Sequence, residues 1–123
     1  MLYYGRRMSH SVHIYPRQLQ VKFDASKDPG FFENENNLVP WTKGQREAIS
    51  NRLALVGFTR DKKNKNSVRF SHDEWHANAL LTDTGLYLSG PLGGNTVFEI
   101  SMFASELAGE DFAKFDPQDG TWE

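Results

Sequence analysis

The stretch SHDEWH at residues 71–76 carries two histidines, His72 and His76, four positions apart. In a helix this spacing places both imidazoles on one face. The helical motif H-E-x-x-H uses such a pair to bind zinc, with its glutamate as a base. Asp73 stands here where the motif has that glutamate. On a strand the two side chains would lie roughly 13 Å apart, too far for one ion. The chemistry of this stretch therefore depends on its secondary structure.

The flanking sequence favours a strand over residues 75–81. Ser71 and Glu74 form an S-x-x-E pattern that is able to cap a helix. However, the stretch SVRF before it is strand-like and LLTDTGLYL after it is typical of a hairpin, so little room is left for a helix between them. A catalytic zinc also needs a third protein ligand, and the sequence offers no obvious one. We therefore predict that the chain binds neither a metal ion nor another cofactor.

A histidine-dependent enzyme is the alternative hypothesis for these residues. Imidazole exchanges protons near neutral pH, and a guanidinium group stabilises the charge that develops on phosphorus during phosphodiester cleavage. No G-x-S-x-G nucleophile elbow indicates another kind of hydrolase. A metal-independent nuclease or phosphodiesterase would combine four residues: His13, Arg17, His72 and His76.

An anion site is a further hypothesis, for the glycine-rich stretch before an expected helix. Backbone N–H groups at a helix start are able to hold an anion. No lysine precedes Thr96, so the P-loop pattern is not met, and a tight turn is the simpler interpretation. The residues in position to hold an anion are Gly93, Gly94, Asn95 and Thr96.

Composition limits the class of protein. The 123 residues suit one domain, and we expect a single α+β domain over residues 1–123 with a loose tail at residues 1–8. With 14 basic and 16 acidic residues the net charge is −2, which gives no general attraction for nucleic acid. No apolar run approaches the roughly 20 residues of a membrane helix. The absence of cysteine excludes disulfides and thiolate metal sites and fits a cytoplasmic protein.

Capping patterns and apolar spacing predict two amphipathic helices. Thr42 and Gln45 form a T-x-x-Q capping box, and Gly57 is placed to end that helix in the left-handed conformation. Thr96 and Glu99 form a second box. The apolar residues expected to face the core from the second helix are Val97, Phe98, Ile100, Met102, Phe103, Ala104 and Leu107.

Alternating apolar and polar residues predict strands elsewhere, for example through Leu19, Val21 and Phe23. The expected strands and hairpins cover residues 11–15, 18–23, 58–70, 75–88 and 112–115. Their short connections favour antiparallel pairing. The predicted fold is a two-layer α+β sandwich, with a mainly antiparallel sheet of about five strands and two amphipathic helices on one face.

Acidic and aromatic residues together predict a surface that binds another protein. Acidic side chains gather in the closing segment and in the loop-like stretch 24–38, and aromatic anchors within complementary charge raise affinity and association rate. Phe31 and Phe32 also have a structural interpretation, in which they fold back onto the core and pin the loop; this one is favoured. The candidate residues are Phe31, Phe32, Glu33, Glu35, Trp41, Glu110, Asp111, Asp116, Asp119 and Trp122.

The functional hypothesis is a small cytoplasmic protein that works by binding a basic protein partner. Its most specific form is an inhibitor or immunity-type protein that masks a partner such as a nuclease toxin. A domain that binds a small ligand between sheet and helices is a second alternative, beside the nuclease or phosphodiesterase.

Overall fold

The computed structural model describes residues 9–63, 67–72, 77–91, 96–117 and 120–122. Some of the expectations above concern residues outside these ranges. They are the loose tail at residues 1–8, the second histidine of SHDEWH, most of the glycine-rich stretch and one of the acidic candidates: His76, Gly93, Gly94, Asn95 and Asp119.

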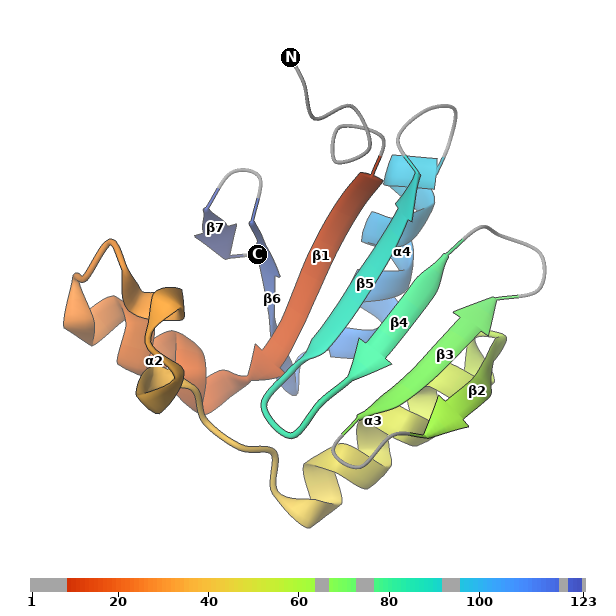
Figure 1. The fold of residues 1–123 in the computed structure, drawn as a ribbon, viewed down its shortest axis with the longest axis horizontal. Coiled ribbons are helices and arrows are strands. Elements are labelled where there is room, and N and C mark those ends of the chain that lie inside the picture. The colour runs from red at the N-terminus through yellow and green to blue at the C-terminus, as the bar shows by residue number, and fades with distance from the viewer. Residues whose placement is uncertain (1–8, 64–66, 73–76, 92–95, 118–119, 123) are drawn as a thin grey trace.

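A sheet of seven strands in the order β2-β3-β4-β5-β1-β6-β7 forms the centre of the fold, and all its strand pairs are antiparallel (Figure 1). The α+β class and the antiparallel pairing are confirmed, but the sheet has more strands than the five expected. The strands are β1 (Ser9–Pro16), β2 (Phe58–Lys63), β3 (Val68–His72), β4 (Asn78–Leu81), β5 (Leu86–Pro91), β6 (Phe112–Asp116) and β7 (Thr121–Trp122).

Helices α3 (Lys43–Leu55) and α4 (Thr96–Ala108) cover one face of the sheet, as predicted (Figure 1). Helix α4 packs on β1, β5 and β6, and α3 packs on β2 and on α4. The capping box of α3 is present, with the Gln45 backbone N–H donating to the Thr42 hydroxyl over 3.1 Å. Gly57 follows α3 with a φ of 101°, the left-handed conformation that ends a helix. No helix in the described segments is both long and apolar enough to cross a membrane.

Helix α2 (Arg17–Ser26) replaces the strand expected at residues 18–23. Pro16 ends β1 with its φ at −56°, and the chain turns directly into the helix. Leu19 and Phe23 are four residues apart, so a helix places both on one side, whereas Val21 is 70% exposed. The same three residues satisfy a strand pattern and a helix pattern, and tertiary packing selects the helix. The fold therefore has a third α-helix, which was not predicted.

The two faces of the sheet are buried by different side chains. On the helix-covered face, Val12 and Ile14 of β1 join the α3 residue Leu53 and the α4 residue Ile100 in a mainly aliphatic core, which also contains a few rings. On the opposite face, α2 and the short 3₁₀ helices η1 (Phe31–Glu33) and η2 (Glu35–Asn37) belong to the segment that covers the β1–β6 end of the sheet. We call the residues buried there the aromatic cluster: Tyr15, Leu19, Phe23, Phe31, Phe32, Tyr87, Phe115 and Trp122.

The segment that contains SHDEWH joins two neighbouring strands. His72 is the last residue of β3, and β4 begins at Asn78, so the predicted strand at residues 75–81 is confirmed for Asn78–Leu81. Of the residues between them, 73–76 lie outside the described part of the chain, and Ala77 is buried, with its carbonyl accepting from the His72 N–H over 3.1 Å. His72 therefore occupies the end of a strand and is not part of a helix.

Candidate functional site

His13 and His72 lie on opposite faces of the sheet. The neighbours of His13 in β1, Val12 and Ile14, point into the helix-covered core, so His13 points to the other face. His72 packs against Phe103 of α4, with the ring centroids 5.1 Å apart, and so lies under the helices. The sheet itself separates the two imidazoles, and they do not form one site.

His13 is held in the aromatic cluster. Its Nδ1 is 3.0 Å from the Tyr15 hydroxyl, and its ring centroid is 4.7 Å from that of Tyr87. Burial lowers the pKa of His13 from 6.5 to about 4, against an opposing effect of the Asp116 carboxylate. Burial, with the neighbouring Tyr87 hydroxyl, raises the pKa of Tyr15. His13 is therefore neutral at pH 7, and the protonated Tyr15 hydroxyl is able to donate to its Nδ1.

His72 has a structural role at the end of α3. Its Nε2 lies 2.9 Å from the Val56 carbonyl, and because a carbonyl only accepts, Nε2 carries the proton of this hydrogen bond. A Cβ atom at Gly57 would lie only 2.6 Å from the same nitrogen. The imidazole thus satisfies a carbonyl at the helix end, and glycine at position 57 leaves room for it.

Arg17, the remaining described member of the proposed catalytic set, lies elsewhere. It is the first residue of α2, and its Nε donates to the Glu110 carbonyl over 2.6 Å, in the turn after α4. The structure therefore does not bring Arg17, His13 and His72 together. Within the described ranges, no group of three or more histidine, aspartate or glutamate side chains is arranged to hold a metal ion.

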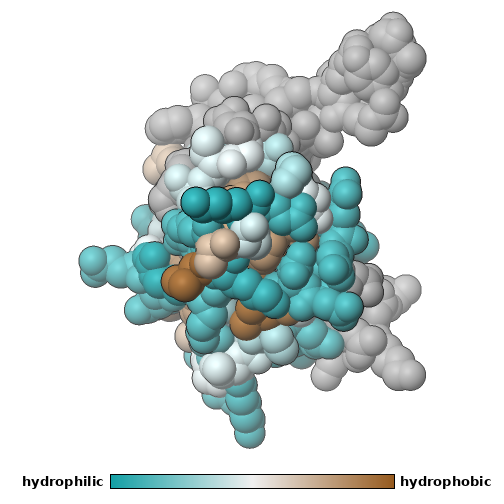
Figure 2. Space-filling view, turned by 90° about the vertical axis from the view of Figure 1, so that its left-hand side faces the viewer, coloured by the Kyte–Doolittle hydropathy of each residue, from teal (hydrophilic) through white to brown (hydrophobic). Residues whose placement is uncertain are grey.

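The aromatic candidates are largely used in packing. Phe31 is 1% exposed and its ring centroid lies 5.2 Å from that of Phe23, so the interpretation that it folds back and pins the loop is confirmed. Phe32 and Trp122 are partly buried in the same aromatic cluster, and Trp41 is 8% exposed in the helix-covered core. Figure 2 shows that the surface on the α2 side of the molecule is mostly hydrophilic, with small separate hydrophobic areas.

The acidic candidates are distributed over separate parts of the surface. Glu110 and Asp111 are exposed in the turn between α4 and β6, and Asp111 forms an ion pair with Arg52 of α3. Glu33 is exposed in η1, and Asp116 is half-buried at the end of β6. The side chain of Glu35 and the whole of Asp119 lie outside the described part of the structure.

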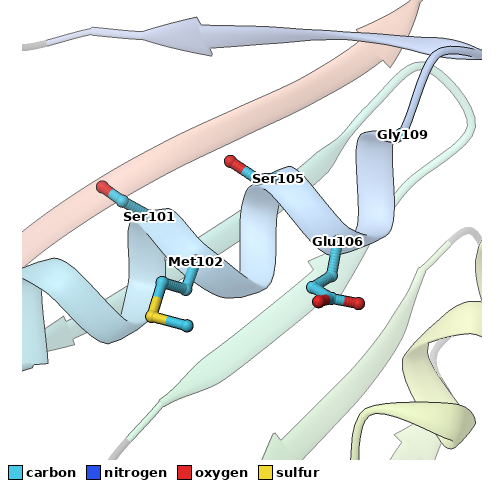
Figure 3. Close-up of a pocket in the computed structure, with 5 residues that line it drawn as sticks. All are labelled: Ser101, Met102, Ser105, Glu106 and Gly109. Atoms are coloured by element: carbon cyan, nitrogen blue, oxygen red, sulfur yellow. The ribbon is translucent and has the colours of Figure 1, made fainter.

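A hollow lies along the outer side of α4 (Figure 3). It has a volume of about 610 Å³ and is lined by Ser101, Met102, Ser105, Glu106 and Gly109. Ser101 and Ser105 point to one side of the helix, and Met102 and Glu106 point to the other (Figure 3). We call this surface the α4 groove.

Met102 was expected to face the core, and this is wrong, because it is 50% exposed in the α4 groove. Ile100, Ala104 and Leu107 take the buried positions of α4 at spacings of four and three. Met102 lies between two of them in sequence and so emerges at the edge of the buried stripe. Sequence reasoning missed this surface because it assigned every apolar residue of the helix to the core.

A smaller hollow adjoins the α4 groove on the side of β6. It has a volume of about 250 Å³ and shares Ser105 and Gly109 with the groove. Lys114 of β6 lines it and is 8% exposed, and its Nζ donates to the Ser105 hydroxyl over 2.9 Å. The ammonium group is therefore turned toward α4 and away from solvent.

Comparison with protein-family models, with curated proteins and with solved structures finds no match for this chain. The function is therefore inferred from the surfaces described above.

Proposed function

We propose that the protein binds a basic segment of another protein through the α4 groove. The observation that carries this proposal is Met102, a large apolar side chain 50% exposed in an open hollow of about 610 Å³. An exposed apolar side chain on a flat surface is ordinary, but one set in a hollow with polar residues around it is typical of a binding site. The anchor therefore differs from the aromatic anchors predicted from the sequence, of which Phe31 and Trp41 are buried and Phe32 and Trp122 partly buried.

The charge of α4 supports a basic partner. The helix, TVFEISMFASELA, contains Glu99 and Glu106 and has neither lysine nor arginine. Neither glutamate is paired with a cation in the described part of the chain. Since complementary charge around an apolar anchor steers a partner into place, this helix favours lysine- or arginine-rich segments. The exposed Glu110 extends the acidic side chains beyond the end of α4.

The small residues of the groove supply its shape. Ser101 and Ser105 of α4 and Gly109 just after it recur every four residues, so small residues line one side of the hollow. A side chain of the partner is able to enter there and contact Met102 and the helix backbone. An apolar anchor, a hollow beside it and acidic neighbours are the parts that a small docking site requires.

The specific form of the proposal is an inhibitor or immunity-type protein of the cytoplasm that masks a basic partner such as a nuclease toxin. A chain without cysteine suits a reducing compartment. Masking needs a surface of complementary charge and no chemistry of its own. The dispersal of His13, Arg17 and His72 over three parts of the fold agrees with binding as the activity.

The test uses three tagged baits in extracts of the native host: the wild-type chain, Met102→Asp and Glu106→Lys. A captured protein counts as the partner only if it is basic and binds the purified chain. Its affinity must fall at least about tenfold with Met102→Asp, the loss expected for an anchor residue, and its association rate must fall with Glu106→Lys.

Glu33→Lys is the matched control, because it makes the same change of charge on an exposed glutamate far along the chain in η1. It should leave binding unchanged within about twofold, since only charges near the interface steer association. Equal affinity for wild type and both α4 variants would overturn the proposal. Equal weakening by Glu33→Lys would show general charge attraction and would overturn it as well.

A further inference from the structure

A second hollow, of opposite charge, lies between α3 and the edge strand β2. Its volume is about 450 Å³. Three of its side chains are cations, one is an acid and two are neutral hydrogen-bonding groups, and none is apolar. The lining residues are Lys43, Arg46, Glu47, Ser50, Asn51 and Arg60. We call this hollow the α3–β2 cavity.

The fold brings these residues together from two elements. Lys43, Glu47 and Ser50 are spaced by four and three along α3, so they share one side of the helix. Arg60 pairs in register with Phe70 of β3, which is buried in the helix-covered core. Arg60 therefore projects to the helix side of the sheet, and because β2 is the edge strand it reaches past the core to the cavity.

Hydrogen bonds from one nitrogen of its guanidinium group fix the Arg46 side chain at the cavity. Its Nη1 donates to the Thr82 carbonyl over 3.1 Å and to the Asp83 carboxylate over 3.0 Å, both in the β4–β5 connection. An arginine has five N–H donors, and the donors on Nε and Nη2 form no hydrogen bond with the described residues. The guanidinium group is therefore oriented before a ligand arrives.

The remaining charges leave the cavity positive. The side chains of Lys43 and Arg60 form neither ion pair nor hydrogen bond with any residue that the structure describes. Asp83 offsets the charge of Arg46, which leaves these two cations against the single carboxylate of Glu47. This local excess of positive charge contrasts with the net charge of −2 for the whole chain.

We infer that the α3–β2 cavity binds a small phosphate monoester. Guanidinium groups match phosphate oxygens with paired donors and lysine adds a point charge, while Ser50 and Asn51 offer neutral hydrogen bonds to the rest of the ligand. No apolar residue lines the cavity, so its charged and hydrogen-bonding groups favour a polar ligand. The charge of about −2 on a phosphate monoester exceeds that of a carboxylate, which favours phosphate where two cations lack partners.

The test is a titration of the full chain followed by two-dimensional ¹⁵N NMR, with glycerol 3-phosphate, inorganic phosphate and acetate as probes. Amide signals of residues 43–51 and 60 should shift and saturate with glycerol 3-phosphate. Its dissociation constant should be at least about tenfold lower than that of acetate, which corresponds to roughly one charge-assisted hydrogen bond. Equal affinity for inorganic phosphate and glycerol 3-phosphate would mean that the neutral groups of the cavity contribute nothing to binding. Free phosphate would then be the ligand, and the assignment of a monoester would be overturned.

Lys43→Gln and Arg60→Gln should each weaken binding of glycerol 3-phosphate about tenfold, the effect of one charged partner. Arg69→Gln is the matched control, because it removes one exposed positive charge from β3, on the face of the sheet away from α3. Equal weakening by Arg69→Gln, or shifts that do not saturate, would overturn the inference. Glu106→Lys in the α4 groove should leave phosphate binding intact, so this site and the protein-binding surface fail or succeed separately.

Discussion

The two faces of the sheet are buried by different kinds of side chain. The helix-covered face is filled mainly by aliphatic residues, with a few rings such as Phe58, Phe70 and Phe112 among them. The opposite face is closed at its β1–β6 end by rings, with Phe32 4.8 Å from Phe115 and Trp122 4.8 Å from Phe115 between centroids. Long helices cover the first face, whereas short helices and loop segments cover the second. Each ring buries more area than an aliphatic side chain, so a few rings are enough to cover the second face without long helices.

Each face also holds one histidine of the proposed catalytic set, and on each face that histidine is part of the packing. His13 is neutral among tyrosines, and His72 ends a helix. Because both histidines are used in packing, the proposed binding sites lie elsewhere, in the α4 groove and in the α3–β2 cavity. The aromatic cluster is a second core, and this interpretation is open to direct tests.

The largest expected effect follows from removal of a ring. Phe31→Ala should lower the free energy of unfolding by about 3–5 kcal/mol, the loss typical of a buried phenylalanine. Leu53→Ala, on the helix-covered face, should cost a similar 2–5 kcal/mol or so, since Leu53 is also fully buried. Urea denaturation would measure both.

Val21→Ala is the control for this comparison, because Val21 is 70% exposed on α2 and should change stability by less than about 0.5 kcal/mol. A cost for Phe31→Ala as small as that of the control would contradict the second core. The aromatic cluster would then be a surface available to a partner.

The next effect concerns pH and belongs to the aromatic face alone. The pKa of His13 is about 4 in the folded protein and 6.5 ordinarily, so the unfolded chain takes up its proton first as the pH falls. The stabilising contribution is complete above pH 6.5 and is lost as the pH falls toward 4. The shift corresponds to about 3 kcal/mol of unfolding free energy.

Denaturation at a series of pH values, for wild type and His13→Gln, would isolate this contribution. Glutamine does not titrate, so the variant should lose less stability than wild type between pH 6.5 and 4. Carboxylates remote from His13 titrate alike in both chains and cancel in the difference. Parallel curves for the two chains would show that His13 is accessible to protons when folded, and the aromatic face would then be open to solvent.

The third effect belongs to the helix-covered face. Gly57→Ala forces an L residue into a φ of 101° and places its Cβ against the His72 imidazole, so it should cost about 2 kcal/mol. The double variant Gly57→Ala/His72→Ala removes the clash but keeps the backbone strain. Its cost should be less than the sum of the two single costs, as thermal or urea denaturation would measure. Additive costs would mean that the imidazole does not occupy the space beside Gly57.

Local signals account for the parts of the fold that could be predicted. The capping box of Thr42 and Gln45 and the glycine at position 57 involve neighbours in sequence, and α3 was predicted from them. The antiparallel pairing likewise followed from short connections. Helix α2 could not be predicted, because the spacing of Leu19 and Phe23 fits both a helix and a strand. Strand β7 has two residues, too few for any pattern.

The candidate site was less predictable, because it depends on which residues long-range packing leaves exposed. The separation of the histidines could have been found from alternation: His13 lies between the core residues Val12 and Ile14, whereas His72 shares its face with Phe70. No such pattern in the sequence predicts that Met102 is exposed or that Arg60 lies beside α3. Both are set by how the helices lie across the sheet, and helix spacing alone does not determine this.

The smallest expected effect is at Asp111, which pairs with Arg52 at the junction of α3, α4 and β6. The Arg52 Nη1 also donates to the Leu107 and Ala108 carbonyls, so the guanidinium group stays in place without the carboxylate. The Asp111 side chain is 65% exposed, and an exposed pair contributes less than about 1 kcal/mol. Asp111→Asn should therefore lower the unfolding free energy by less than that. It should also leave partner binding unchanged, because Arg52 already neutralises this acid. A tenfold loss of binding with Asp111→Asn would move the docking surface from the α4 groove to the turn after the helix.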